Sequence, residues 1–158
     1  MMSIKLVIVD HRLIHGQVGF TWTKFLQTNC ILIASDTIMQ DPLKMTAMKM
    51  AVPTGVKLVM KSIDDSIAAL NSGVTDKYSL LILCESIEDV AKLASQVPLI
   101  KEINLGGMKD GADRKQVSKS VHLSADDIEL IQQLLKTGVD LTVQMVPDEQ
   151  AVDIRKLI

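Results

Sequence analysis

The chain has 158 residues and a formal net charge of −2, and 47% of its residues are hydrophobic, mostly aliphatic residues and methionine because only 3% are aromatic. Positive and negative residues are interspersed along the sequence, which excludes a broad basic surface for nucleic acid or anionic lipid. No apolar stretch has the length of a membrane-spanning helix and no signal-peptide core follows the N-terminus, so we expect a cytoplasmic protein.

Short aliphatic runs recur along the chain, separated by amphipathic segments. We predict strands at residues 4–9, 30–34, 56–60, 80–84, 102–105 and 141–146. Most of these runs are continuous rather than alternating in polarity, which is typical of strands buried on both faces of a parallel sheet. The pattern predicts an α/β fold with an open, mainly parallel central sheet and helices on both faces. Because no repeat, linker or low-complexity tract interrupts it, we expect a single domain over residues 1–158.

Capping residues mark the starts of the helices between these runs. Asp41-Pro42 begins a predicted helix in which apolar residues recur at helical spacing, and we expect four of them on its inner side: Leu43, Met45, Met48 and Met50. Serine caps begin further predicted helices over residues 62–71, 86–96 and 124–136. Another helix is predicted from about Gly16, directly after the loop that follows the first strand.

The loop after the first strand places a histidine at the start of that helix. Open α/β sheets bind ligands beyond the carboxyl ends of their strands, which directs attention to residues 10–16, 35–41 and 106–120. In the first of these loops His15 precedes a helix N-terminus, where backbone N–H groups and the helix dipole favour an anion. The same field favours the neutral imidazole, which is the nucleophilic form. A neutral histidine beside an anion site can attack phosphorus, so His15 is either a carrier of a phosphoryl group or an ordinary surface or capping residue of the loop.

Neighbouring residues complete the expected site. Arg12 can reach over the loop with a guanidinium suited to bidentate contact with phosphoryl oxygens. Asp10, at the end of the strand, either orients Arg12 or accepts a hydrogen bond from His15; we slightly favour the first role, but the sequence does not decide between them. Gly16 lets the backbone approach the phosphate without a Cβ. The pair Gly106-Gly107 either makes an anion-binding nest of N–H groups or only a tight turn.

The segment Arg12-Leu13-Ile14-His15-Gly16-Gln17 resembles the signature of a known family. It is similar to that of the IIB domains of the mannose/fructose/sorbose family of the phosphoenolpyruvate-dependent sugar phosphotransferase system, in which this histidine is phosphorylated. Other matching segments extend over nearly the whole chain: Trp22, Asp36, Asp41-Pro42, Lys49-Met50-Ala51-Val52-Pro53, Asn104-Leu105-Gly106-Gly107-Met108, Ser118-Lys119-Ser120-Val121 and Gln144-Met145-Val146-Pro147. Ser35 and Met39 depart from the family pattern, so the second loop is expected to differ in shape.

The resemblance implies a cycle of phosphoryl transfer. A IIA domain or protein would phosphorylate His15 on Nδ1, and His15 would pass the group to a sugar held by the membrane IIC and IID subunits, which would keep the chain peripherally associated with the membrane. The expected phosphate-binding residues are Gly16, Gln17, Gly106 and Gly107. No metal and no cofactor are implied, because Arg12 and backbone N–H groups would neutralise the phosphoryl charge.

Other interpretations remain open. The same helix N-terminus could bind phosphate or a nucleotide without covalent chemistry. Asp10, His11 and His15 could hold a metal ion, although no Cys or Glu cluster supports them; otherwise His11 is expected to be a solvated spectator. Four basic residues form either a solvated loop or a rim for an acidic partner: Lys109, Arg114, Lys115 and Lys119. Exposed edge strands would allow a homodimer, and the sequence does not indicate which sugar is transported.

Overall fold

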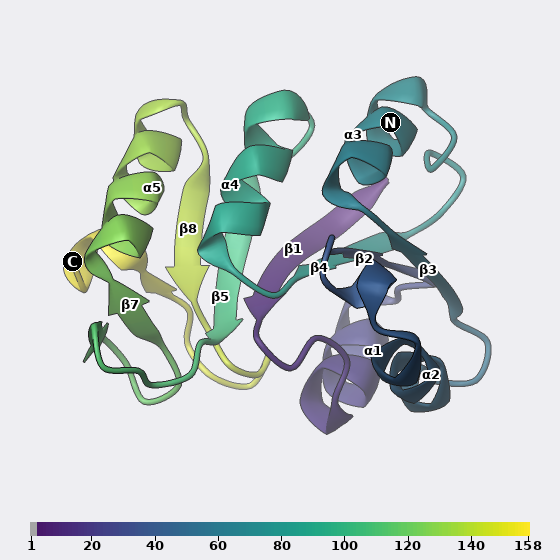
Figure 1. Ribbon diagram of the computed structural model, residues 1–158, viewed down its shortest axis with the longest axis horizontal. Coiled ribbons are helices and arrows are strands. Elements are labelled where there is room, and N and C mark those ends of the chain that lie inside the picture. Colours follow the sequence, from purple (N-terminus) through teal and green to yellow (C-terminus); the bar gives the residue numbers. More distant parts are fainter. Residues whose placement is uncertain (1–2) are drawn as a thin grey trace.

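A mainly parallel sheet forms the centre of the computed structural model, which describes residues 3–158 (Figure 1). The seven-stranded sheet has the order β3-β2-β4-β1-β5-β8-β9, and all its pairs are parallel except β8 with β9. Its strands are β1 (Ile4–Asp10), β2 (Cys30–Ala34), β3 (Lys57–Lys61), β4 (Leu80–Cys84), β5 (Glu102–Gly107), β8 (Asp140–Val143) and β9 (Val152–Asp153). A separate antiparallel pair comprises β6 (Arg114–Gln116) and β7 (His122–Ser124).

Helices cover both faces of the sheet, as the sequence predicts. Those on one face are α3 (Ile63–Ser72), α4 (Ile87–Gln96) and α5 (Ala125–Lys136), which follow one another across the sheet in Figure 1. The other face is packed by the π-helix η1 (Gln17–Trp22), which continues into α1 (Thr23–Leu26), and by α2 (Pro42–Ala51). Short 3-10 helices complete the chain: η2 (Ile38–Gln40) and η3 (Ile154–Lys156). The chain moves from β1 toward β3 and then back past β1 toward β9, and this reversal places the two sets of helices on opposite faces of the sheet.

Alternate residues of the central strands point into two separate cores. On β1, Val7 and Val9 pack with the face that carries α3, α4 and α5, whereas Ile8 packs with the face that carries η1 and α2. All residues of β2 and β4 are buried, as expected for strands in the middle of a parallel sheet. The edge strand β3 is only partly buried. This arrangement fixes which end of β1 reaches the surface: its last residue, Asp10, lies at the carboxyl edge of the sheet.

Most predicted elements lie where the sequence places them, and the differences have physical reasons. The serine caps Ser62, Ser86 and Ser124 each accept a hydrogen bond from a first-turn N–H group, and Asp127 completes a capping box with Ser124. The predicted strand over residues 141–146 ends at Val143. The inner side predicted for α2 is partly wrong, because Met48 is buried and Met45 half-buried while Leu43 and Met50 are exposed.

The carboxyl edge of the sheet is the lower edge in Figure 1, where the loops after β1, β2 and β5 emerge. The helix that begins with η1 starts at this edge, on the side of α2. Within residues 3–158 no helix is both long and apolar enough to cross a bilayer. The fold thus brings the three loops singled out from the sequence to one edge.

Candidate functional site

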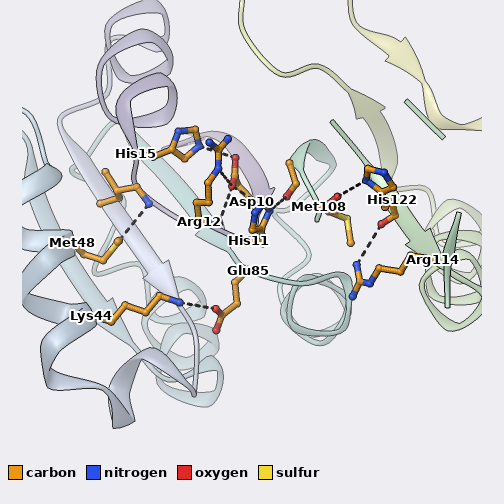
Figure 2. Close-up of polar contacts among 12 residues, drawn as sticks. Asp10, His11, Arg12, His15, Lys44, Met48, Glu85, Met108, Arg114 and His122 are labelled. Carbon is orange, nitrogen blue, oxygen red and sulfur yellow. Dashed lines mark hydrogen bonds and ion pairs between the residues drawn. The ribbon is translucent and has the colours of Figure 1, made fainter. Parts of the chain in front are cut away.

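His15 lies at the junction between the β1 loop and the helix that begins with η1 (Figure 2). Its backbone carbonyl accepts a hydrogen bond from the N–H group of Gly19 at 2.6 Å, so the residue immediately precedes the first helical turn. Its imidazole is mostly enclosed, with 16% of the side chain exposed. The placement at a helix N-terminus agrees with the sequence-based interpretation, and this end of the helix favours an anion.

Asp10 is the residue that orients His15. Its Oδ2 atom lies 2.8 Å from Nε2 of His15, and its Oδ1 atom accepts a hydrogen bond from the backbone N–H group of Arg12 at 2.9 Å. An ionised carboxylate can only accept a hydrogen bond, so Nε2 carries the proton in the neutral ring and Nδ1 has the free electron pair. The carboxylate therefore selects the nucleophilic nitrogen.

The Asp10 carboxylate remains charged despite its burial, since only 2% of the residue is exposed. Burial raises the pKa of Asp10, but the hydrogen bonds from His15 and from the Arg12 backbone outweigh burial and hold the pKa below its ordinary value. The side chain of Arg12 adds to this effect, with Nε 3.5 Å from Oδ1. The sequence leaves open whether Asp10 contacts Arg12 or His15, and the structure gives Asp10 both contacts.

Arg12 and His11 both lie near the Oδ1 atom of the same carboxylate, with Nε of Arg12 at 3.5 Å and Nδ1 of His11 at 3.9 Å. The Arg12 side chain is 49% exposed, so its guanidinium is available to an incoming group. The Nδ1 atom of His11 lies 3.2 Å from the carbonyl oxygen of Gly107, and His11 N–H donates to the same oxygen. These bonds tie the loop after β1 to the end of β5. Figure 2 shows Arg12, His11 and His15 gathered around Asp10.

Gly106 and Gly107 lie within β5 rather than in an anion-binding nest. Neither has a positive φ, and both pack against the Asp10 carboxylate. A Cβ on Gly107 would lie 3.0 Å from Oδ2 of Asp10, and one on Gly106 would lie 3.6 Å from the same atom. The glycines thus allow the close approach of β5 to Asp10, and contact of their N–H groups with phosphate stays a prediction. The side chain of Gln17 lies outside the described part of the structure.

Gly107→Ala is expected to slow any reaction of His15, because the new Cβ would displace the carboxylate that orients the imidazole. We expect about a tenfold lower rate of His15 phosphorylation. Gly106→Ala should have a smaller effect, since its Cβ stands farther from Oδ2. Single-turnover rates of His15 phosphorylation in the two variants test this order. Equal rates in the two variants would show that the distance between β5 and the Asp10 carboxylate does not determine the rate.

The second and third loops contribute differently from the first. Glu85, after β4, accepts hydrogen bonds from Ser35 at 2.6 Å and from Thr37, and it pairs with Lys44 of α2 at 3.3 Å. In the third loop, Arg114 turns inward to the carbonyl of His122 and to Asp127, whereas three lysines are exposed: Lys109, Lys115 and Lys119. The second loop therefore holds α2 in place, and only part of the predicted basic rim is free.

Trp22 anchors the helix that carries His15 at its start. Its indole Nε1 donates to the carbonyl of Met145 at 3.0 Å, which joins the helix to the segment after β8. Only 2% of Trp22 is exposed. The sequence pointed to Trp22 and to residues 144–147 as separate matching segments, but not to their contact. No group of three or more His, Cys, Asp or Glu side chains within residues 3–158 is arranged to hold a metal ion.

A family model described as the PTS system sorbose subfamily IIB component matches residues 4–158. The chain belongs to this family. Among curated relatives, the N-acetylgalactosamine-specific phosphotransferase enzyme IIB component 2 of Escherichia coli is 33% identical over 158 residues, which is 100% of both chains. The mannose-specific EIIAB component of Escherichia coli is 29% identical over 99% of this chain but only 49% of its own length.

Solved IIB structures share this fold. The IIBSor domain of the sorbose permease from Klebsiella pneumoniae superposes with a TM-score of 0.92 at 31% identity, over 98% of this chain and 95% of that domain. The expected α/β architecture and the resemblance noted from the sequence are thereby confirmed. The protein is a sugar-specific IIB component of the sorbose/mannose type, and such components are parts of a phosphotransferase.

Proposed function

We propose that His15 is the residue that carries the phosphoryl group in this IIB component. The observation that carries the proposal is the 2.8 Å contact between Asp10 Oδ2 and His15 Nε2, which leaves Nδ1 as the basic nitrogen at the start of a helix. Nδ1 attacks the phosphorus of a phosphohistidine on the donor, so that a new N–P bond forms as the donor N–P bond breaks. A sugar hydroxyl oxygen then attacks the same phosphorus, the N–P bond to His15 breaks as the O–P bond forms, and the hydroxyl proton passes to the Nδ1 atom that the phosphoryl group leaves.

The surrounding groups stabilise the phosphoryl oxygens during both transfers. Phosphoryl transfer depends mainly on alignment and on stabilisation of the charge on those oxygens. The exposed guanidinium of Arg12 and the N–H groups of the first helical turn, including those of Gly16 and Gln17, are positioned to supply that stabilisation. No cofactor takes part in this scheme.

The donor is a IIA domain or protein, and the acceptor sugar is held by membrane IIC and IID subunits. The family supports these partners, and the name of the mannose-specific EIIAB relative joins a IIA to a IIB part in one chain. The positive charge of the exposed lysines in the third loop is complementary to an acidic surface on the donor. These lysines are Lys109, Lys115 and Lys119. The chain acts as a single domain in the cytoplasm, held at the membrane through IIC and IID.

Mass measurement tests the carrier role directly. Incubation with phosphoenolpyruvate, the general phosphocarrier proteins and IIA should add one acid-labile, base-stable phosphoryl group to the chain. Reversible phosphate binding by the same helix N-terminus would instead leave the mass unchanged after denaturation. An unmodified mass with partners that are active on another IIB component would contradict the proposal.

Arg12→Lys is expected to slow phosphoryl transfer while keeping the local charge. Lysine lacks the planar fork that contacts two phosphoryl oxygens at once, so we expect about a tenfold lower rate. Rapid-quench measurement of transfer from phosphorylated IIA gives this rate. Arg155→Lys, the same substitution in η3 at an exposed residue paired with Asp153, is the control. Equal rates for Arg12→Lys and the wild-type protein would remove Arg12 from the transfer step.

A further inference from the structure

The helix α2 contacts the His15 loop at two points. The backbone N–H group of Ile14, the residue before His15, donates to Sδ of Met48 at 3.4 Å, the bond drawn as the dashed line at Met48 in Figure 2. At the end of α2, the carbonyl oxygen of Ala51 lies so close to η1 that a Cβ on Gly19 would stand 3.1 Å from it. The residue before His15 and the start of η1 are therefore both in contact with α2.

The Met48 thioether satisfies a backbone donor that water cannot reach. Ile14 is 3% exposed and Met48 is 7% exposed, and both belong to the core between η1, α2 and the sheet. A buried N–H group without an acceptor is costly, and a thioether sulfur is a weak but adequate acceptor. An aliphatic side chain of similar volume would fill the same space but leave the Ile14 N–H group unpaired.

The His15 loop needs such support because part of it is strained. Leu13 has φ of 56°, a left-handed conformation that is unfavourable for a residue other than glycine. Its side chain is fully buried and packs in the same core as Met48. A β-turn from Asp10 to Leu13, closed by a 2.9 Å hydrogen bond, precedes the residue bound by Met48. Packing from α2 thus holds a loop conformation that the isolated chain would disfavour.

The helix α2 is itself fixed to the carboxyl edge of the sheet. Asp41 caps its first turn by accepting from the N–H group of Lys44 at 3.0 Å, and the ammonium group of Lys44 pairs with Glu85 at 3.3 Å. Glu85 follows β4, which lies beside β1 in the sheet. Burial raises the pKa of Glu85, but the hydrogen bonds from Ser35 and Thr37 outweigh it and hold the pKa below its ordinary value, so the anchor is charged at neutral pH.

We propose that Met48 is a positioning residue for His15, and that α2 sets the place of the phosphoryl-accepting imidazole through the bond from Ile14 N–H to the Met48 thioether. The inference rests on the proposed carrier role of His15. It gives a function to α2, which contains Met48 and ends within the Lys49-Met50-Ala51-Val52-Pro53 segment: the helix contacts the loop before His15 and the start of η1 without touching the phosphoryl group. Met48 is buried, so it acts on the rate of transfer and not on donor binding.

Met48→Leu tests this inference, because leucine conserves apolar volume and removes the acceptor. With saturating phosphorylated IIA, we expect kcat for His15 phosphorylation to fall about threefold to tenfold while KM for IIA stays unchanged. The amide proton of Ile14 should also exchange faster with solvent, since it loses its partner. Met45→Leu is the matched control: Met45 is half-buried on the same helix and packs against the same core.

The outcomes separate this inference from the carrier proposal. A wild-type rate in Met48→Leu, or an Ile14 amide that exchanges freely in the wild-type protein, would overturn the role of Met48. An equal loss of kcat in Met45→Leu would show that the effect comes from general packing of α2, and it would overturn the role of Met48 as well. If Met48→Leu fails to fold, exchange of the wild-type Ile14 amide still decides. Failure of the carrier role would appear differently, as a wild-type protein that accepts no phosphoryl group.

Discussion

His15→Ala is expected to abolish phosphorylation of the chain and to leave its fold intact. Alanine removes the imidazole that is proposed to attack phosphorus at this helix N-terminus, so the covalent adduct cannot form. The imidazole makes one hydrogen bond to Asp10, and its loss should lower the free energy of unfolding by only about 1 to 2 kcal/mol. Mass measurement after incubation with the complete donor chain gives the first result, and thermal unfolding gives the second.

His11→Ala is the matched control for this experiment. It removes an imidazole from the same loop whose ring contacts the Gly107 carbonyl and not the proposed phosphoryl position. This variant should still accept one phosphoryl group. An adduct on His15→Ala would remove the carrier role from His15, and its disappearance from His11→Ala alone would move that role to His11.

Asp10→Asn is expected to reduce the transfer rate about 100-fold or more. Asparagine fits the space, but it must present either an N–H group to Nε2 of His15 or an N–H group to the Arg12 backbone donor. The first arrangement favours the ring tautomer with the proton on Nδ1, so the nitrogen that should attack has no free electron pair. The second arrangement places the amide N–H group of asparagine against the backbone N–H group of Arg12, so two donors face each other. Loss of a comparable orienting carboxylate is severe in other histidine-dependent enzymes.

The rate of phosphoryl transfer and the pH dependence of the free energy of unfolding measure the catalytic and the stabilising roles of Asp10 separately. Because the folded-state pKa of Asp10 is lowered, its stabilising contribution is present above its unfolded-state pKa and disappears as the pH falls through the folded-state value. The deficit in the free energy of unfolding of Asp10→Asn, about 1 to 3 kcal/mol, should therefore appear at neutral pH and vanish in acid. Asp113→Asn, at an exposed loop position, is the control. A wild-type rate in Asp10→Asn would show that the tautomer is fixed by another group.

The fold was largely predictable because its signals are local. Continuous aliphatic runs located the buried strands, and the serine caps located α3, α4 and α5. The inner face of α2 was not predictable in the same way. Its apolar residues occur at several positions around the helix, and only contact with η1 and β2 decides that Met48 is buried while Leu43 and Met50 are exposed.

The candidate site was predictable where its residues lie close together in sequence. Asp10, Arg12 and His15 fall within one short loop, so their proximity follows from chain connectivity. The long-range contacts carry no such signal. Three contacts join segments that are distant in sequence and are brought together only by the order of strands in the sheet. They are the contacts of Gly107 with Asp10, of Met48 with Ile14 and of Trp22 with Met145.

The position of the phosphoryl group on the imidazole tests the central claim most directly. The chain is labelled with ¹⁵N in its histidines, phosphorylated by IIA, and examined by ³¹P and ¹⁵N NMR under basic conditions that preserve phosphohistidine. The geometry predicts one phosphoryl group bonded to Nδ1 of His15, with Nε2 still protonated and bonded to Asp10. A phosphoryl group on Nε2, on His11 or on no histidine would contradict it.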